Sequence, residues 1–220
     1  MKNLIYVLLL TVFFSCENDK VVLLTEINHS EITEILDVSP GYLFYDETKT
    51  DSVELNRKNL ISTTNWLINI DKRLTLKQVI PHIKYLQDKK ANSSHKKEGV
   101  KNYFTCNDTS KKNLGFIDFT DVAYVTDEKG YIKDLKTAHA NIVILNQKDI
   151  KIITSNNNIV QTTKETLAKT IKDLFQLEKT LLYLEFYDSL SFQDYITIKA
   201  LMSKLNLENI EISNHEIIFN

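Results

Sequence analysis

LLYLEFYDSLSFQDYITIKALMSKL, residues 181–205, is the stretch of sequence that decides the fold. Its first six residues form a largely apolar run without Gly or Pro, which predicts a buried strand. A short polar turn follows, and Ser191 is a typical N-cap residue. The apolar residues after this cap recur at helical spacing, as Tyr195, Ile198, Met202 and Leu205. A strand that leads through a tight turn into an amphipathic helix is typical of a sheet covered by helices.

The flanking sequence extends this pattern over residues 140–220. Residues 142–145 and 149–154 are β-rich runs, and the asparagines that follow mark a turn. Thr162 with Glu165 matches the capping-box pattern and predicts another helix. Its apolar residues are Leu167, Ile171, Leu174 and Phe175. Strands at 210–212 and 216–219 close the chain, so the predicted order of this C-terminal module is β-α-β-α-β.

A similar unit occurs earlier in the chain. LINIDKRLTL at 67–76 parallels YLEFYDSLSF at 183–192, because each is a strand, a polar turn, a leucine, a hydroxyl cap and an apolar residue. Thr75 with Gln78 predicts a capped helix, with a kink or a shortened start at Pro81. Its apolar face consists of Leu76, Val79, Ile80, Ile83 and Leu86. Either any strand–turn–helix unit gives such a match, or the chain holds two related modules at 40–108 and 140–220.

The N-terminal region, 29–139, is otherwise less regular. Residues 30–36 predict a short helix, which Pro40-Gly41 then ends. Residues 88–99 predict a loop, and 127–130 predict a turn before a strand at 131–132. The strand candidates are 42–45, 53–55, 66–70, 103–106, 115–119 and 122–125. We expect an α+β protein with small mixed sheets and amphipathic helices on one face of each sheet.

The N-terminal sequence MKNLIYVLLLTVFFSC has the composition of a targeting segment. A basic start precedes an apolar run at 4–14, shorter than the ~20 residues that span a bilayer, and Cys16 follows. The pattern resembles the signal peptide of a Bacteroidetes-type bacterial lipoprotein. The resemblance implies removal of residues 1–15, a lipid on Cys16, a tether over 16–28, and anchorage in the cell envelope, at the outer membrane. A retained membrane anchor and a buried N-terminal helix are the alternatives.

The C-terminal module resembles the periplasmic domain of the ExbD/TolR family. The matching elements are the strand 151–154, the helix 163–177, the strand 182–188, the helix 192–205 and the strand 210–213. The resemblance implies an envelope module that binds a protein partner or peptidoglycan. Family members carry an uncleaved membrane helix with an acidic residue for proton-driven work, whereas the run at 4–14 has no Asp or Glu. This departure implies a binding role rather than proton conduction.

Composition and spacing argue against several functional classes. The formal net charge of −2 provides no field to attract nucleic acid, and the lysine-rich stretch 89–97 is typical of a solvated loop. The glycines lie too far apart for a phosphate-binding loop, and no Gly-x-Ser-x-Gly motif occurs. No metal-binding pair is formed by His29, His82, His95, His139 and His215. We therefore predict no catalytic residue, no cofactor and no metal.

Three groups of residues keep a second interpretation. Cys106 has no disulfide partner if Cys16 carries lipid, and a buried inert thiol is the prediction, with a catalytic cysteine in a low-pKa environment as the alternative. A solvated loop, or a divalent-cation site, is predicted for Asp118, Asp121, Asp127, Glu128 and Asp134. Core packing, or a ligand groove, is predicted for Tyr42, Phe44, Tyr45 and Trp66.

Together these patterns favour a non-enzymatic, lipid-anchored envelope protein that acts as a binding or scaffold module. The membrane, reached through Cys16, and a protein or peptidoglycan partner are its expected contacts, in ExbD/TolR-type energy transduction or transport. Two other classes stay open. One is an envelope hydrolase whose site is assembled from scattered residues. The other is a surface receptor for a small molecule or glycan.

Overall fold

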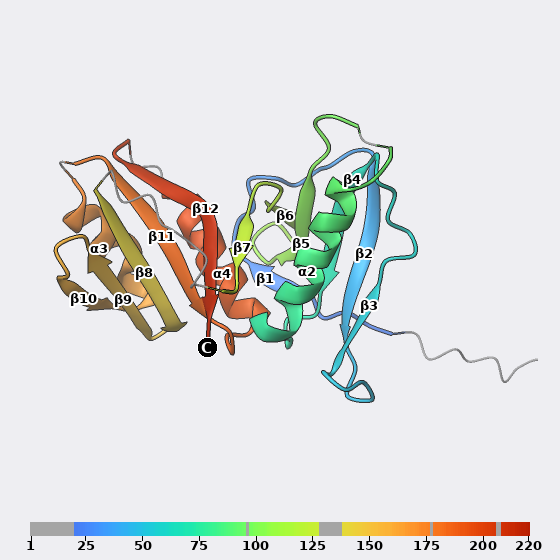
Figure 1. Ribbon diagram of the computed structural model, residues 1–220, viewed down its shortest axis with the longest axis horizontal. Coiled ribbons are helices and arrows are strands. Elements are labelled where there is room, and N and C mark those ends of the chain that lie inside the picture. Colours follow the sequence, from blue (N-terminus) through green and yellow to red (C-terminus); the bar gives the residue numbers. More distant parts are fainter. Residues whose placement is uncertain (1–19, 96, 128–137, 177, 206–207) are drawn as a thin grey trace, which may run out of the picture.

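The structure, a computed structural model, describes residues 20–95, 97–127, 138–176, 178–205 and 208–220. These residues form two six-stranded mixed sheets, and the α+β prediction is confirmed. In Figure 1 one sheet carries the helix α2 (Leu76–Ala91), and the other carries α3 (Lys164–Leu174) and α4 (Phe192–Ser203). The predicted signal peptide with Cys16, the predicted strand at 131–132, and Glu128 and Asp134 lie outside the described residues.

The first sheet has the strand order β3-β2-β4-β5-β6. Its strands are β1 (Thr25–Ile27), β2 (Val38–Tyr45), β3 (Val53–Asn56), β4 (Asn65–Ile70), β5 (Asn102–Asp108) and β6 (Asn113–Asp118). The strands β2, β4 and β5 are parallel to one another, whereas β3 and β6 run antiparallel at the edges. The first half of β5 pairs with β4, and its second half pairs with β1.

The second sheet has the strand order β10-β9-β8-β11-β12-β7. Its strands are β7 (Ala123–Val125), β8 (His139–Asn146), β9 (Asp149–Thr154), β10 (Ile159–Thr162), β11 (Thr180–Tyr187) and β12 (Ile210–Phe219). The strands β8, β11, β12 and β7 are parallel, and β9 and β10 form an antiparallel extension.

Two strands do not fit the domain boundaries expected from the sequence. The strand β1 lies within the expected tether 16–28, so the tether ends before residue 25. The strand β7 comes from the region 29–139 but pairs with β12 of the C-terminal module. The expected boundary between 139 and 140 therefore does not separate two independent sheets.

The predicted helix at 30–36 is wrong. His29 and Ser30 donate their backbone N–H groups to the Asp108 carboxylate, at 3.1 and 2.6 Å, and Ile32 forms a bridge with Phe116. The carbonyl of Ile32 accepts from the N–H of Phe116 at 3.0 Å, so an acceptor that a helix over 30–36 would need is used by β6 instead. The segment is therefore an irregular connection along the edge of β6.

The predicted chain break at Pro40-Gly41 is also wrong, because both residues lie within β2. Proline cannot donate to a ladder, but Pro40 precedes the part of β2 that pairs with β3, so one side of the strand needs no donor there. A Cβ on Gly41 would lie 3.2 Å from Leu60 Cδ1 and 3.3 Å from Ile68 Cδ1. Close packing, and not a turn, explains this glycine.

Two helix ends differ from the predictions. The helix α2 continues to Ala91, so the loop predicted from 88 begins at 92. The N-cap of α3 is Thr163 and not Thr162, because Thr162 pairs with Ile150 as the last residue of β10. Pro81 is accommodated inside α2, and the predicted apolar face of that helix is buried.

The two sheets repeat one topology. An antiparallel hairpin, a parallel strand, a helix and a final parallel strand occur as β2, β3, β4, α2 and β5, and again as β8, β9, β11, α4 and β12. With Thr75 and Ser191 taken as equivalent, buried residues coincide along both strands and helices: Ile68 with Leu184, Ile70 with Phe186, and Leu86 with Met202. The two tandem modules are therefore related in topology, and the second adds β10 and α3.

The modules meet where α2 and α4 begin. The N–H of Leu76 donates to the carbonyl of Leu190 at 2.9 Å, and the N–H of Phe192 donates to the carbonyl of Leu74 at 2.6 Å. A second reciprocal pair of backbone bonds lies next to the first. The N–H of Lys77 donates to the carbonyl of Asp188, and the N–H of Gln193 donates to the carbonyl of Lys72. Each bond thus has its counterpart from the other module, and the junction has approximate two-fold symmetry.

One hydrophobic core spans both modules. The ring of Phe104 in β5 makes edge contacts with Phe192 and Tyr195 of α4, at centroid distances of 5.2 and 6.3 Å. The helix α4 therefore packs against both sheets, and it brings its side chains to the space between them.

Candidate functional site

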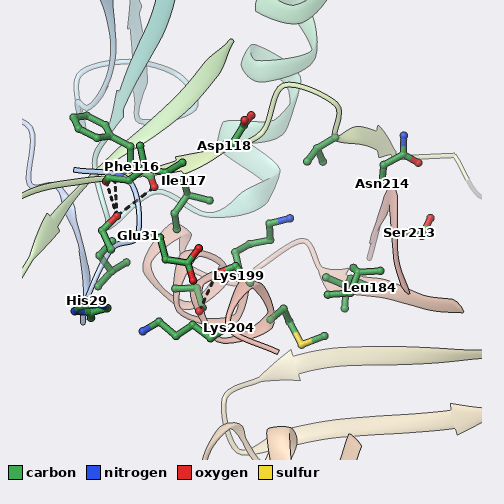
Figure 2. Close-up of a pocket in the computed structure, with 18 residues that line it drawn as sticks. His29, Glu31, Phe116, Ile117, Asp118, Leu184, Lys199, Lys204, Ser213 and Asn214 are labelled. Carbon is green, nitrogen blue, oxygen red and sulfur yellow. Dashed lines mark hydrogen bonds between the residues drawn. The ribbon is translucent and has the colours of Figure 1, made fainter. Parts of the chain in front are cut away.

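A cavity of about 360 Å³ lies between the two modules (Figure 2). Its walls come from the end of β1 and residues 29–32, from β6, from the second half of α4, and from β11 and β12. Most of its lining is apolar, and its size falls within the ~300–1,000 Å³ of small-molecule sites. It is therefore a candidate binding site, and α4 brings a charged side chain, Lys199, to it.

A chain of four polar side chains lies behind one wall of this cavity. The hydroxyl oxygens of Tyr124 and Tyr195 are 3.1 Å apart, and Tyr195 donates to Glu216 Oε2 at 2.7 Å. Lys199 forms an ion pair with Glu216 Oε1. Because the Tyr195 proton goes to Glu216, Tyr124 is the donor in the bond between the two tyrosines. Glu216 is 1% exposed, and this carboxylate is held by an ammonium group and a hydroxyl.

Burial keeps both tyrosines neutral. It raises the pKa of Tyr124 and of Tyr195 well above the usual value for tyrosine, and the negative charge of Glu216 adds to the effect. Tyr195 therefore acts as a fixed hydrogen-bond donor to the carboxylate, and Tyr124 acts as a fixed donor to Tyr195. A buried carboxylate without such donors would cost several kcal/mol.

Lys199 is the member of this chain that reaches the cavity. Its side chain is 15% exposed, and Figure 2 shows it extending from α4 into the space between β6 and β12. On the facing wall the register of β12 shifts, since Leu182 pairs with Ile212 but Leu184 pairs with Glu216. Residues 213–215 form a bulge, a feature that often re-aims side chains beside functional sites.

Charges of both signs surround the cavity. Lys204 donates to the carbonyl of Asn28 at 2.5 Å, and Lys101 pairs with Asp118 at 2.8 Å. Glu31 also lines the wall (Figure 2). Because positive and negative groups are nearly balanced here, the site does not favour a strongly charged ligand.

None of the four members of the polar chain was predicted from the sequence as a site residue. Lys199 follows directly after the apolar position Ile198 in α4, and Glu216 begins the apolar run of the last strand. A charged residue within an apolar run was the available signal. It did not reveal the pairing, because residues 199 and 216 meet only when β12 packs against α4.

The three described members of the acidic group, Asp118, Asp121 and Asp127, are not brought together as a metal site. Asp118 accepts hydrogen bonds from the N–H and hydroxyl of Thr120, at 2.9 and 2.6 Å, in addition to its ion pair with Lys101. Among the described residues no group of three or more His, Cys, Asp or Glu side chains could hold a metal ion. Asp118 instead stabilises a turn at the cavity wall through its hydrogen bonds with Thr120.

The prediction of a buried thiol at Cys106 is confirmed. Its side chain is fully buried and accepts a hydrogen bond from Thr25 Oγ1, with 3.2 Å between the oxygen and Sγ. Burial raises the pKa of this thiol to about 12. Only a thiolate is a good nucleophile, so this cysteine is unsuited to covalent catalysis.

The aromatic residues divide between two faces of the first sheet. Trp66 is buried, as predicted. Tyr42 and Phe44 alternate with the buried Leu43 and stack on each other with 5.7 Å between ring centroids, on the opposite face of β2. Tyr45 lies under the guanidinium of Arg73, 4.4 Å from its ring centroid.

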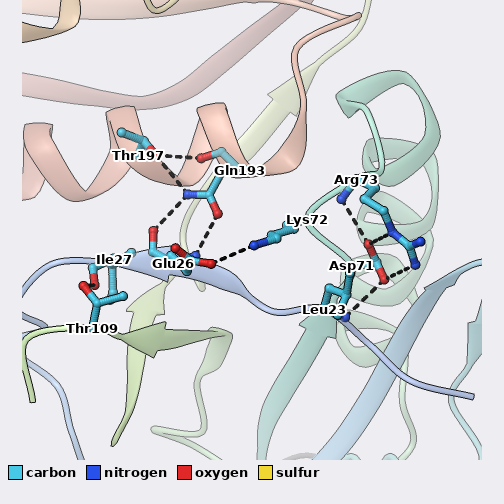
Figure 3. Close-up of polar contacts among 9 residues, drawn as sticks. All are labelled: Leu23, Glu26, Ile27, Asp71, Lys72, Arg73, Thr109, Gln193 and Thr197. Atoms are coloured by element: carbon cyan, nitrogen blue, oxygen red, sulfur yellow. Dashed lines mark hydrogen bonds and ion pairs between the residues drawn. The ribbon is translucent and has the colours of Figure 1, made fainter. Parts of the chain in front are cut away.

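Residues 23–27, which lead into and form β1, make hydrogen bonds with both modules (Figure 3). Leu23 donates its N–H to the Asp71 carboxylate at 3.1 Å and accepts from the N–H of Lys72 at 2.8 Å. The Gln193 amide of α4 binds Glu26 twice: Nε2 donates to its carbonyl at 2.9 Å, and Oε1 accepts from its N–H at 2.8 Å. The side chain of Gln193 thus substitutes for a neighbouring strand.

Comparison with protein-family models, curated proteins and solved structures finds no match to this chain. Within the described residues, none of the helices combines the length and the apolar character needed to cross a membrane.

Proposed function

We propose that this chain is a lipid-anchored, non-enzymatic protein of the bacterial cell envelope that serves as a binding or scaffold module. The observation that carries the proposal is the attachment of residues 23–27 to both modules. Asp71 and Lys72 of the first module hold Leu23, and Gln193 of the second holds Glu26. A segment leaving a lipid at Cys16 would therefore be tied to the junction of the two modules.

The number of residues between Cys16 and Leu23 supports the same proposal. Six residues, 17–22, lie between Cys16 and Leu23. The seven Cα–Cα steps cover at most ~3.5 Å each when extended, so the tether reaches about 25 Å at most, and the ion pairs of Lys20 with Asp46 and Glu54 shorten that reach. The junction would stay close to the membrane surface. Such an arrangement suits a module that presents a fixed surface to another envelope component, either a protein or peptidoglycan, and the resemblance to ExbD/TolR connects it with energy transduction or transport.

The test compares the native protein with Cys16→Ala in cells. We expect the native protein to start at Cys16, to carry lipid by intact mass, and to fractionate with membranes, whereas the variant is released or retains its leader. After extraction in mild detergent we expect a partner or peptidoglycan to copurify. An unlipidated chain that begins at Met1, or a monomer that retains neither partner nor peptidoglycan, would contradict the proposal.

A second variant tests the junction itself. Gln193→Ala removes both hydrogen bonds to Glu26, so we expect faster proteolysis within residues 20–28 while the variant stays lipidated. Gln161→Ala is the matched control, because this glutamine makes an exposed bond to Asp149 in the second sheet. Equal proteolysis of the two variants would show that Gln193 does not hold the segment.

A further inference from the structure

We propose that the cavity between the modules binds a small amphipathic molecule with an apolar body and a neutral hydrogen-bond acceptor, which Lys199 contacts. This inference goes beyond the proposed function, since it concerns a small-molecule site and does not depend on the lipid anchor. It rests on a comparison that the duplicated topology provides within the chain itself.

The first module shows what the second would look like without its polar cluster. Counting from the equivalent caps Thr75 and Ser191, Val79 occupies the position of Tyr195 and Ile83 that of Lys199. In the strands, Ile68 pairs with Phe104, whereas its equivalent Leu184 pairs with Glu216. An apolar set in one module, Val79, Ile83 and Phe104, thus corresponds to a polar set in the other, Tyr195, Lys199 and Glu216.

The apolar set is fully buried, with an exposure of 0% for each of its three side chains. This architecture therefore packs a helix on a sheet without any charge at these positions. Replacing a buried ion pair with apolar side chains is often neutral or stabilising. The polar set is consequently not required for folding, and a functional role explains its presence.

The register between the two parallel strands beside the cluster also differs between the modules, at equivalent positions. From Trp66 to Ile68 the partner positions in β5 advance by two, from Asn102 to Phe104. From Leu182 to Leu184 the partner positions in β12 advance by four, from Ile212 to Glu216. The extra residues form the bulge at 213–215, and Ser213 and Asn214 line the cavity. The polar cluster and the bulged part of the cavity wall are thus both specific to the second module.

The chemistry of Lys199 indicates the class of ligand. An ammonium group has three N–H donors, and the carboxylate of Glu216 already balances its charge. A carbonyl or amide oxygen can accept a further hydrogen bond without bringing a new charge into a largely apolar site. The walls formed by Ile117, Val122, Leu184 and Ile212 suit an apolar chain. The volume holds about a dozen groups of the size of water, at ~30 Å³ each.

A matched series of head groups tests this class. The full chain carrying Cys16→Ser is titrated without detergent with octanamide, octanoate and octylamine, which share one alkyl chain. We expect octanamide to bind with a Kd at least tenfold lower than either charged compound. In NMR spectra the amide signals of Ile117, Ser213 and Asn214 should shift, while that of Leu174 in α3 should not. Absence of binding by octanamide, or tighter binding of octanoate or octylamine, would overturn the proposal.

The double variant Lys199→Met/Glu216→Leu tests the contact. It removes both charges together, so that neither is left buried alone, and its fold is checked by circular dichroism. We expect its preference for octanamide to disappear, whereas Lys164→Met, outside the cavity, keeps it. An unchanged preference in the double variant would refute the role of Lys199. Should the double variant not fold, the pattern of NMR shifts in the parent chain decides whether the cavity is the site.

Discussion

Thr75 and Ser191, the N-cap residues of α2 and α4, face each other as an antiparallel bridge at the junction of the two modules. The first N–H groups of a helix have no partner within the helix. Here the turn of each module supplies a carbonyl to the helix of the other module. The carbonyl of Leu190 accepts from the N–H of Leu76 in α2, and the carbonyl of Leu74 accepts from the N–H of Phe192 in α4. Each module thus completes the start of the other module's helix.

This relationship predicts that the two modules unfold together. Ser191 Oγ accepts from the N–H of Asp194 at 3.1 Å, so Ser191→Ala should cost about 1 kcal/mol. Because the helix starts are shared, the loss should lower the urea midpoint reported by Trp66 in the first module as much as the midpoint reported by far-UV circular dichroism. Ser203→Ala at the exposed end of α4 is the control, with a change below about 0.5 kcal/mol. Separate midpoints for the two probes would show that the modules are independent.

The Lys199–Glu216 pair predicts an asymmetry between single and double variants. Lys199→Met leaves the buried Glu216 without its charge partner and should cost about 3–5 kcal/mol in the free energy of unfolding. Adding Glu216→Leu should recover more than half of that loss. Lys101→Met breaks the more exposed pair with Asp118 and should cost less than about 1 kcal/mol. Urea denaturation measures all three, and a double variant less stable than Lys199→Met would contradict the expectation.

The Asp71 carboxylate predicts a dependence of stability on pH. Burial by itself would raise its pKa, but hydrogen bonds from Arg73 and from the N–H of Leu23 outweigh burial and lower the pKa. A lowered pKa in the folded state stabilises the fold above the unfolded value of ~3.9, and this contribution disappears as the pH falls through the folded value.

Asp71→Asn should therefore be destabilised at pH 7, by about 1–3 kcal/mol for the loss of charged hydrogen bonds. The difference from the native protein should shrink as the pH falls below about 4. Asp37→Asn is a matched control, because Asp37 forms an exposed pair with Lys97 and has a positive φ that Asn tolerates. Thermal melts across this pH range provide the measurement, and a difference that grows on acidification would have the wrong sign.

The Cys106 thiol predicts protection from alkylation. With a pKa of about 12 and a fully buried side chain, it should react with iodoacetamide at pH 8 at least about 100-fold more slowly in the folded protein than in urea. The Cys16→Ser chain leaves it as the single thiol. Similar rates in both conditions would mean that β5 is not packed as described.

Local patterns in the sequence predicted the strand–turn–helix units well. The apolar face of α2 and the cap at Ser191 follow from residues within one or two turns of each other, so periodicity and capping rules apply directly. The predictions that did not hold involve distant partners. The segment 30–36 is held by Asp108 and Phe116, and Pro40 fits in β2 because β3 pairs only with the later residues of that strand.

The candidate site was beyond the reach of such rules for the same reason. Tyr195 and Lys199 lie four residues apart on one helix, but nothing in the sequence connects this pair with Tyr124 in a short strand or with Glu216 in the last strand. The sequence alone determined the α+β class and the strand–turn–helix units, since these depend on hydrophobic period and turn chemistry between near neighbours, but it left the duplication as one of two interpretations. Only the tertiary structure decided that two helix starts complete each other and that a buried ion pair opens on a cavity, because both depend on long-range packing.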